Sequence, residues 1–181
     1  QSEYRPTEYV QGWLSFWFDE AKRLQVAQAF QQARIDYLKK IWAKDRDLQA
    51  EGFYIDDADI SSALDSYSRK ITTTLKVGDL LMHEASLTKQ LYKIAANKTK
   101  LNGFNREHDG QDLANGFLNH GNYLAYGLAA TTLWVLGIPH GFAIMHGKTR
   151  RGALVFDVAD LVKDTLVLPW AFICAKEKMT E

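Results

Sequence analysis

The chain has 181 residues, of which 46% are hydrophobic, and its 22 basic residues balance its 22 acidic residues. Such a chain can bury the core of one globular domain, and its zero net charge gives no global attraction to nucleic acid. The single cysteine, Cys174, excludes an intrachain disulfide framework and fits a reducing compartment, so we expect a cytoplasmic protein.

Helical spacing of apolar residues covers most of the first hundred residues. Residues 13–48 predict one long helix or two, with Gly52 beyond them as a stop signal. Residues 56–77 predict an amphipathic segment that opens with acids, which suit the start of a helix. A third helical segment follows at 79–96, and the polar, glycine-containing stretch 97–110 predicts a mobile connection.

The second half of the chain predicts two more helical segments. Residues 112–136 form an apolar helix that Gly137 and Pro139 close, as a glycine cap followed by a proline does. After a short apolar run, residues 158–176 return to helical spacing, with Pro169 as a kink or break. The predicted fold class is therefore all-α.

Residues 113–147 contain no Asp, Glu, Lys or Arg. A bilayer-spanning helix needs about 20 consecutive apolar residues, but Asn, His and Thr side chains interrupt this stretch, and Gly137 and Pro139 break it. We therefore expect no membrane span. The stretch instead predicts the buried central helix of a single multi-helix domain, residues 1–181.

Basic residues gather in two places, although the net charge is zero. Lys89 and Lys93 stand four apart and share a helix face, and Lys148, Arg150 and Arg151 directly follow the uncharged stretch. Together the two groups predict a track for a DNA backbone. Each group taken alone has a simpler alternative, a solvated surface.

Four residues carry the acids and the imidazole that metal-dependent phosphate chemistry needs: Glu84, His146, Asp157 and Asp160. Carboxylate oxygens with one imidazole suit Mg²⁺ or Mn²⁺, which neutralises phosphate charge and activates an attacking oxygen. Asp157 and Asp160 are three residues apart and share a helix face, whereas Glu84 must come from a separate helix.

Each of these residues also has a structural explanation. Asp157 at the N-cap of the last helix, with Asp160 in its first turn, would stabilise the helix end, and spacing alone favours this alternative. Glu84 on an amphipathic helix would be a solvated charge, and His146 competes with four other histidines. The five tryptophans occupy apolar positions that predict core packing rather than base stacking.

A family resemblance decides between these alternatives. The CRISPR-associated spacer-acquisition integrases, or Cas one family, have a catalytic core that resembles the segment GIPHGFAIMHGKTRRGALVFDVADLVKDTLVLPWAF. Two helices of that family resemble NGFLNHGNYLAYG and HEASLTKQLYKIAA, and its type I-F branch resembles SEYRPTEYVQGWLSFWFDEAKRL. These segments cover most of the chain.

The resemblance implies roles for the candidate residues. The metal ligands would be Glu84, His146 and Asp160, with Asp157 as a further active-site acid in or near the metal shell. Further catalytic positions near the scissile phosphate or the catalytic centre would be Lys148, Lys163 and Tyr126. From charge and proximity, the expected DNA-binding residues are Lys89, Lys93, Lys148, Arg150 and Arg151.

The resemblance further implies a metal-dependent DNA endonuclease and integrase that acts in antiviral defence. Its site would use Mg²⁺ or Mn²⁺ to orient a DNA 3′-hydroxyl for attack on a phosphodiester, which joins protospacer DNA to a CRISPR array by transesterification. Two alternatives stay open. One is a metal-dependent nuclease acting on branched or single-stranded DNA, and the other is a non-catalytic DNA-binding scaffold.

The family's β-rich N-terminal domain has no counterpart in this sequence, because no segment alternates like a strand for the required length. We therefore expect the helical catalytic domain alone, truncated at both ends. In the family, two homodimers are bridged by a Cas two dimer, which the I-F branch fuses to the helicase-nuclease Cas three. The implied partners are DNA (protospacer and CRISPR repeat or leader), a second copy of the chain and a Cas two protein.

Overall fold

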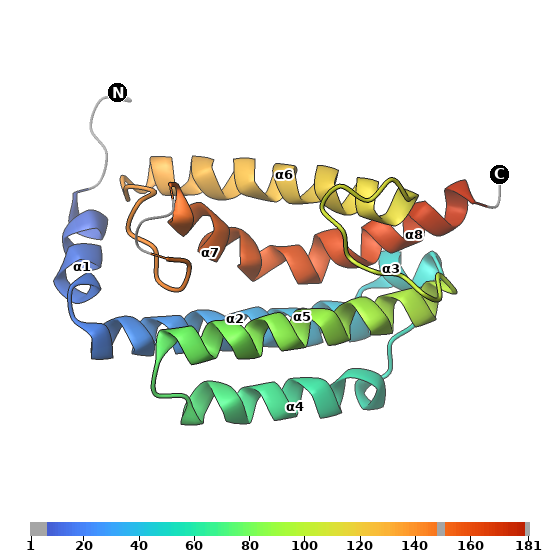
Figure 1. The fold of residues 1–181 in the computed structure, drawn as a ribbon, viewed down its shortest axis with the longest axis horizontal. Helices are drawn as coiled ribbons and strands as arrows, with labels where there is room; N and C mark the ends of the chain where they lie inside the picture. The colour runs from blue at the N-terminus through green and yellow to red at the C-terminus, as the bar shows by residue number, and fades with distance from the viewer. Residues whose placement is uncertain (1–6, 148–150, 180–181) are drawn as a thin grey trace.

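The computed structural model describes residues 7–147 and 151–179, and all regular elements in these ranges are helical (Figure 1). This confirms the predicted all-α class. The elements are α1 (Glu8–Trp17), α2 (Glu20–Lys44), α3 (Arg46–Ala50), α4 (Asp57–Thr73), α5 (Val77–Thr99), α6 (Leu113–Val135), α7 (Ala153–Val162), the π-helical turn η1 (Lys163–Val167) and α8 (Leu168–Lys178).

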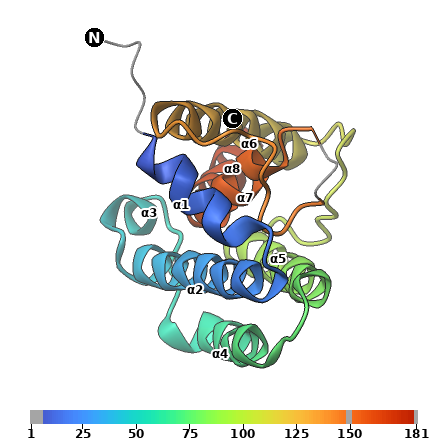
Figure 2. The ribbon, with the colours of Figure 1, turned by 90° about the vertical axis from the view of Figure 1, so that its left-hand side faces the viewer.

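One continuous helical rod runs through the centre of the domain. It consists of α7, η1 and α8, which lie between α6 on one side and α2 with α5 on the other (Figures 1 and 2). More than half of the residues of α7 and of α8 are buried. On the far side of α2 and α5 lies α4, and α1 crosses one end of the domain.

A buried central helix is therefore present, but it is α7 to α8 rather than residues 113–147. The helix α6 lies in the outer layer, where Tyr123, Leu124 and Leu128 are 74%, 77% and 63% exposed. An uncharged helix can carry apolar residues on its outward face as well as its inward face, so the absence of charge did not establish burial. No helix in the described ranges is long and apolar enough to cross a membrane.

Residues 13–48 fall into more than one helix. The first break is at Asp19, whose carboxylate accepts the N–H groups of Ala21 (3.0 Å) and Lys22 (3.1 Å) at the start of α2. Asp45 caps α3 in the same way. Aspartate stabilises a helix start because it satisfies N–H groups that have no helical partner.

The end of α6 matches the predicted glycine cap. Gly137 has a φ of +71°, its N–H donates to the carbonyl of Trp134, and the N–H of Ile138 donates to the carbonyl of Leu133. These two bonds form a Schellman motif, which glycine favours because its φ is positive. The chain then turns back across the end of the domain in the segment that carries His146.

Pro169 is accommodated by the π-helical turn. Proline has no N–H, so the carbonyl of Thr165, four residues earlier, lacks its usual helical donor. The wider turn η1 lies directly before this proline. From α2, the indole N–H of Trp42 donates to the carbonyls of Asp164 (3.1 Å) and Thr165 (3.2 Å). The rod therefore passes through a proline without ending.

The start of α7 rules out the alternative in which Asp157 is the N-cap of the last helix. Gly152 precedes the helix with a φ of +66°, and the apolar run 153–156 forms the first turn of α7. Asp157 thus lies inside the helix, so its N-cap role is wrong. Its side chain is buried and needs another explanation.

The connection between α5 and α6 is anchored in its middle. Asn115 of α6 accepts the N–H of Glu107 (3.0 Å) and donates to the carbonyl of Asn105 (2.9 Å). The ring of Phe104 packs against Phe172 of α8, with 4.7 Å between the ring centroids. The expected mobility of this connection stays a prediction.

Gly121 allows α6 to approach η1 closely. A Cβ at this position would overlap the side chain of Val167. We expect Gly121→Ala to lower the free energy of unfolding by about 1–3 kcal/mol, as overpacking does, although alanine favours a helix by about 1 kcal/mol over glycine. Denaturant unfolding followed by tryptophan fluorescence measures the change.

Two glycines of the same helix provide matched controls. A Cβ at Gly116 or Gly127 meets no atom within 4 Å. Gly116→Ala and Gly127→Ala should therefore raise the free energy of unfolding by up to about 1 kcal/mol. A Gly121→Ala protein as stable as these controls would contradict the close approach of Val167.

Candidate active site

Asp157 organises the segment that carries His146. Its Oδ2 accepts the backbone N–H groups of Ile144 (2.7 Å) and Met145 (3.1 Å), and its Oδ1 accepts that of His146 (3.1 Å). The same Oδ1 lies 2.7 Å from Nδ1 of the His146 imidazole. A proton on Nδ1 leaves the lone pair of Nε2 available as a metal ligand.

The metal-ligand role expected for Asp157 does not match this geometry. Both of its oxygens are occupied by protein donors, and its side chain is only 2% exposed. A carboxylate that binds the other nitrogen of a ligating histidine orients the ring and fixes its tautomer. Asp157 is therefore placed to position His146.

Two tryptophans of α1 hold the same segment from the other side. The indole N–H of Trp13 donates to the carbonyl of Phe142 (2.9 Å), and that of Trp17 donates to the carbonyl of Ala143 (2.8 Å). The two residues stand four apart, so they share one face of α1. They contribute hydrogen bonds as well as apolar surface, and thereby connect α1 to the loop before His146.

Asp160, Lys163 and Tyr126 lie together although they come from α7, η1 and α6. Asp160 Oδ1 is 2.7 Å from Nζ of Lys163. The same Nζ is 3.5 Å from the Tyr126 hydroxyl and 5.2 Å from the centroid of its ring. The tertiary structure thus brings together three of the residues named by the family resemblance.

Lys163 provides a positive charge beside Asp160 that persists at neutral pH. Burial lowers the pKa of its ammonium group, but the charge of Asp160 and its hydrogen bond have the larger combined effect and raise the pKa above its usual value. The group therefore stays charged at neutral pH. A fixed cation beside Asp160 suits an anionic ligand such as a phosphate.

Glu84 reaches the same neighbourhood from α5. The hydrogen bond with Asp157 raises the pKa of His146 against the effect of burial, and the charges of Asp160 and Glu84 add to the rise. Glu84 itself accepts an N–H of Arg34 (2.6 Å), and Arg34 also pairs with Asp164 of η1. The tertiary structure thus links Glu84 of α5, through Arg34, to the turn η1, whose Lys163 contacts Asp160.

The donor set fits a hard divalent cation. Within the described ranges, no three His, Cys, Asp or Glu side chains converge closely enough to hold a metal ion as they stand. However, the hydrogen bonds that Glu84 accepts in these ranges both end on Oε1, and the contact of Lys163 is with Oδ1 of Asp160. Among the contacts of the described residues, each acid thus keeps a second oxygen for a metal, and His146 keeps Nε2.

A basic hollow opens beside Glu84. It has a volume of about 560 Å³ and lies between α5 and the connection 100–112. Lys89 and Lys93 line it, as does Arg106, which donates to two asparagines of α6. The two lysines thus share a helix face, as predicted, and that face adjoins Glu84.

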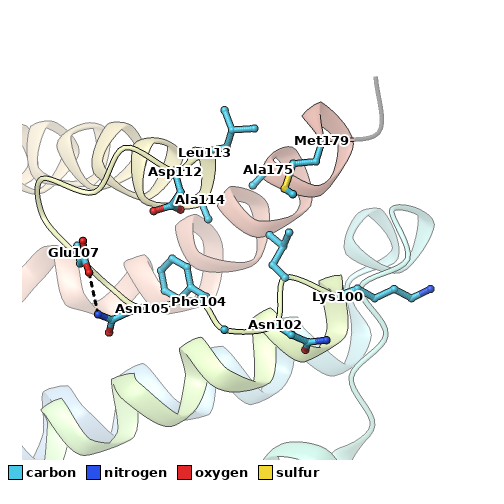
Figure 3. A pocket seen from close by; sticks show the side chains of 12 residues that line it. Lys100, Asn102, Phe104, Asn105, Glu107, Asp112, Leu113, Ala114, Ala175 and Met179 are labelled. Atoms are coloured by element: carbon cyan, nitrogen blue, oxygen red, sulfur yellow. Dashed lines mark hydrogen bonds between the residues drawn. The ribbon is translucent and has the colours of Figure 1, made fainter.

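The other basic residues are placed differently. Arg151 is exposed directly before α7, whereas Lys148 and Arg150 lie outside the described residues. A second hollow, of about 440 Å³, lies where the connection 100–112 meets α8 (Figure 3). Its lining includes Phe104, Met179 and none of the expected catalytic residues, so it is separate from the candidate active site.

Comparison with known families assigns the chain to a family. The family described as "CRISPR associated protein Cas1" matches residues 8–181. The chain belongs to the Cas1 family. Two curated relatives are named CRISPR-associated endonuclease Cas1: that of Pectobacterium atrosepticum is 55% identical over 179 residues, and that of Pseudomonas aeruginosa is 54% identical over 177 residues. These matches cover 98% and 97% of this chain but 55% of each relative, so the chain spans about half of their length.

A solved structure agrees with the Cas1 assignment. A Cas1 protein from Thermotoga maritima matches with a TM-score of 0.77 over 99% of this chain and 56% of that one. The sequence identity is 15%, so this likeness shows the fold alone. The family resemblance is confirmed, while the type I-F branch stays a prediction.

Sequence reasoning missed two buried charges of this Cas1 domain. Arg34 of α2 forms ion pairs with Glu84 (2.6 Å) and with Asp164 of η1. One signal could have revealed Arg34, because it falls within the stripe that α2 buries, together with Ile35 and Leu38, where a cation is unusual. No comparable signal marked Asp164, since acids are common on exposed helix faces.

The raised pKa of His146 predicts a pH dependence in the metal-free Cas1 domain. A raised pKa means that the folded state binds the proton more tightly than the unfolded state. We expect the resulting stability to be complete below about pH 6.5, the unperturbed value, and to be lost as the pH rises through the raised pKa. Urea unfolding between pH 5 and pH 9 measures this.

His146→Gln is the control for that titration, because glutamine does not titrate. The difference in free energy of unfolding between wild type and His146→Gln should shrink as the pH rises. A difference that stays constant, or that grows with pH, would contradict a raised pKa.

Proposed function

We propose that this Cas1 domain is the catalytic part of a metal-dependent DNA integrase. It joins the 3′-hydroxyl ends of protospacer DNA to a CRISPR array by transesterification. The observation that supports this most is the chain of contacts from Glu84 through Arg34 to η1, whose Lys163 contacts Asp160, together with the bond by which Asp157 orients His146. Two carboxylates and one neutral imidazole are a donor set for Mg²⁺ or Mn²⁺.

The bound cation would neutralise phosphate charge and lower the pKa of the attacking hydroxyl. Lys163 adds a fixed positive charge that stabilises the negative charge on the phosphate oxygens as the reaction proceeds. Tyr126 keeps the ammonium in place through its hydroxyl and its ring. The incoming 3′-oxygen forms a phosphodiester while the target strand's 3′-oxygen leaves and takes up a proton, so no covalent protein intermediate is needed.

The basic side chains bind the DNA backbone in this proposal. Lys89 and Lys93 line the hollow that adjoins Glu84, so a strand bound there would run toward the acids. Neutralising a residue that contacts a phosphate lowers the salt dependence of binding by about one unit on a log scale. The DNA-binding set is Lys89, Lys93, Lys148, Arg150 and Arg151.

The assembly is part of the same proposal. The chain covers 55% of each curated relative, so each relative has surfaces beyond the part that matches. We propose a homodimer that works with a Cas two protein, fused to Cas three in the type I-F branch. The DNA partners are the protospacer and the CRISPR repeat or leader.

A metal-dependent nuclease is the second candidate, and it is favoured by the two curated relatives, each named CRISPR-associated endonuclease Cas1. Water would then replace the 3′-hydroxyl at the same site, and the substrate would be branched or single-stranded DNA. A non-catalytic scaffold is the weaker alternative, because it requires the acids to be helix caps. Asp160 lies inside the continuous rod of α7, η1 and α8 and away from its N-terminal end, so it cannot cap the helix or stabilise its dipole.

Strand transfer on a branched DNA that mimics a half-integrated spacer tests the proposal. The full-length protein, with Mn²⁺, should release the branch and rejoin the target strand. DNA with a 3′-deoxy end in place of the attacking 3′-hydroxyl should not be rejoined. Cleavage that continues with the 3′-deoxy DNA would favour the nuclease, and inactivity on both DNAs would favour the scaffold.

A further inference from the structure

Arg34 is the most deeply buried cation in the described part of the chain. Its side chain is 2% exposed, and burying a guanidinium is unfavourable unless each N–H finds an acceptor. On α2 it lies in the buried stripe with Ile35 and Leu38. A guanidinium at this buried position therefore needs hydrogen-bond acceptors that offset the loss of its hydration.

The partners of Arg34 come from α5 and η1, which carry residues of the candidate active site, and from α2 itself. Nη1 donates to Oε1 of Glu84 (2.6 Å) and to Oε1 of Gln31 (3.2 Å). Nε donates to Oδ2 of Asp164 (3.0 Å), and Nη2 donates to that same oxygen and to the hydroxyl of Thr88 (2.9 Å). These five bonds use the full donor capacity of the guanidinium.

Arg34 leaves one oxygen of Glu84 for another ligand. Within the described ranges, the two hydrogen bonds to Glu84 come from Arg34 and Thr88, and both end on Oε1. The carboxylate is thereby fixed at one oxygen while Oε2 stays outside the network. Carboxylates that bind metals are commonly oriented by such hydrogen bonds.

The same guanidinium also holds η1, the turn that begins three residues after Asp160. Asp164 binds Arg34 through its side chain, and its carbonyl accepts the indole N–H of Trp42 (3.1 Å). Arg34 and Trp42 are eight residues apart on α2, so both project toward η1 from similar positions on the helix surface. The wide turn that carries Lys163, the partner of Asp160, is therefore fastened to α2 at two points.

We propose that Arg34 is a positioning residue that joins the two carboxylates of the metal site. It orients Glu84 on α5 and, through Asp164, fixes η1 and hence Asp160. Its burial keeps it away from DNA, so it acts only through these partners. This inference rests on the proposed metal-dependent function, and it assigns to α2 a part in metal binding that its sequence did not indicate.

The test is Mn²⁺ binding by the full-length protein without DNA, measured by electron paramagnetic resonance of the free ion. Arg34→Lys keeps the charge but lacks the planar fork that reaches Glu84 and Asp164 together. We expect Arg34→Lys to weaken Mn²⁺ binding by about 10- to 100-fold, the usual effect of losing an outer partner. Thr88→Val, which removes one bond from Glu84, should weaken it by about 3- to 10-fold.

A separate measurement controls for loss of folding in the variants. Circular dichroism gives the folded fraction, and binding is expressed per folded molecule. If Arg34→Lys fails to fold, the paired change Arg34→Met with Asp164→Leu removes both buried charges, which proteins often tolerate, and it should still weaken Mn²⁺ binding by at least about 10-fold. Lys98→Met, which removes a cation paired with Asp59 outside the site, should bind Mn²⁺ as wild type does.

Each outcome decides the inference. Folded Arg34 and Thr88 variants that bind Mn²⁺ as tightly as wild type would overturn the positioning role and leave the proposed function intact. Wild-type protein that binds no Mn²⁺ would overturn both. Weakened binding in the Arg34 and Thr88 variants alone would support the role, because a purely structural residue would not change the affinity of the folded molecules.

Discussion

Asp160→Asn is expected to lower the rate of metal-dependent strand transfer by about 100- to 1,000-fold while the fold is kept. Asparagine has nearly the same shape as aspartate but no negative charge, so it is a poor ligand for a hard cation. The change also removes the charge that faces Nζ of Lys163 at 2.7 Å. The measurement is rejoining of branched DNA by the full-length protein at a fixed Mn²⁺ concentration.

Asp59→Asn is the matched control for that experiment. Asp59 also pairs with a lysine, Lys98, at 2.6 Å, but on the exposed side of α4. Its loss should leave the strand-transfer rate unchanged. If Asp160→Asn kept a rate within tenfold of wild type, Asp160 would not be a metal ligand.

Asp157→Asn is expected to cost about 3–5 kcal/mol of the free energy of unfolding, the largest stability loss at the site. The two oxygens of Asp157 accept three backbone N–H groups and face the imidazole of His146. An amide has one oxygen and one NH₂ group, so either orientation turns a donor toward two of these partners. Equilibrium urea unfolding at pH 7 measures the loss.

The same substitution should also weaken Mn²⁺ binding in the molecules that fold. With NH₂ toward His146, the ring must accept at Nδ1 and carry its proton on Nε2, which is then lost as a ligand. With NH₂ toward Ile144 and Met145, the backbone of the segment moves. Either orientation disturbs the ligand that the segment presents.

Asp112→Asn controls for loss of a carboxylate that accepts backbone hydrogen bonds. Asp112 caps α6 by accepting the N–H of Asn115 at 3.0 Å, and it is exposed. Asparagine caps helices as well as aspartate does, so this change should cost less than about 1 kcal/mol. Equal costs at the two positions would contradict the special role of Asp157.

Local sequence determined most of the helical elements and the end of α6. Apolar spacing predicted every long helix, and Gly137 ended α6 by the bonds expected of a glycine cap. These features depend on residues a few positions apart, so they can be read along the chain. The family motif likewise identified Glu84, His146 and Asp160 as a set, which spacing alone could not do.

The sequence of a single helix does not show whether that helix lies at the centre of the domain or in its outer layer. The uncharged α6 was expected in the centre, yet its outward face is exposed and α7 to α8 take the central place. Pro169 predicted an irregularity, but the π-helical turn also required Trp42 from α2 to satisfy the freed carbonyls. Both outcomes depend on which helices pack together.

The sequence by itself determined an all-α chain, the ends of α6 and membership of the Cas1 family, and it predicted the donor types of the proposed metal site. Only the tertiary structure decided that Asp157 orients His146 and that Arg34 links Glu84 to Asp164. The physical reason is distance along the chain. A buried charge is tolerated only where acceptors from other elements surround it, and folding alone brings residues 34, 84 and 164 together.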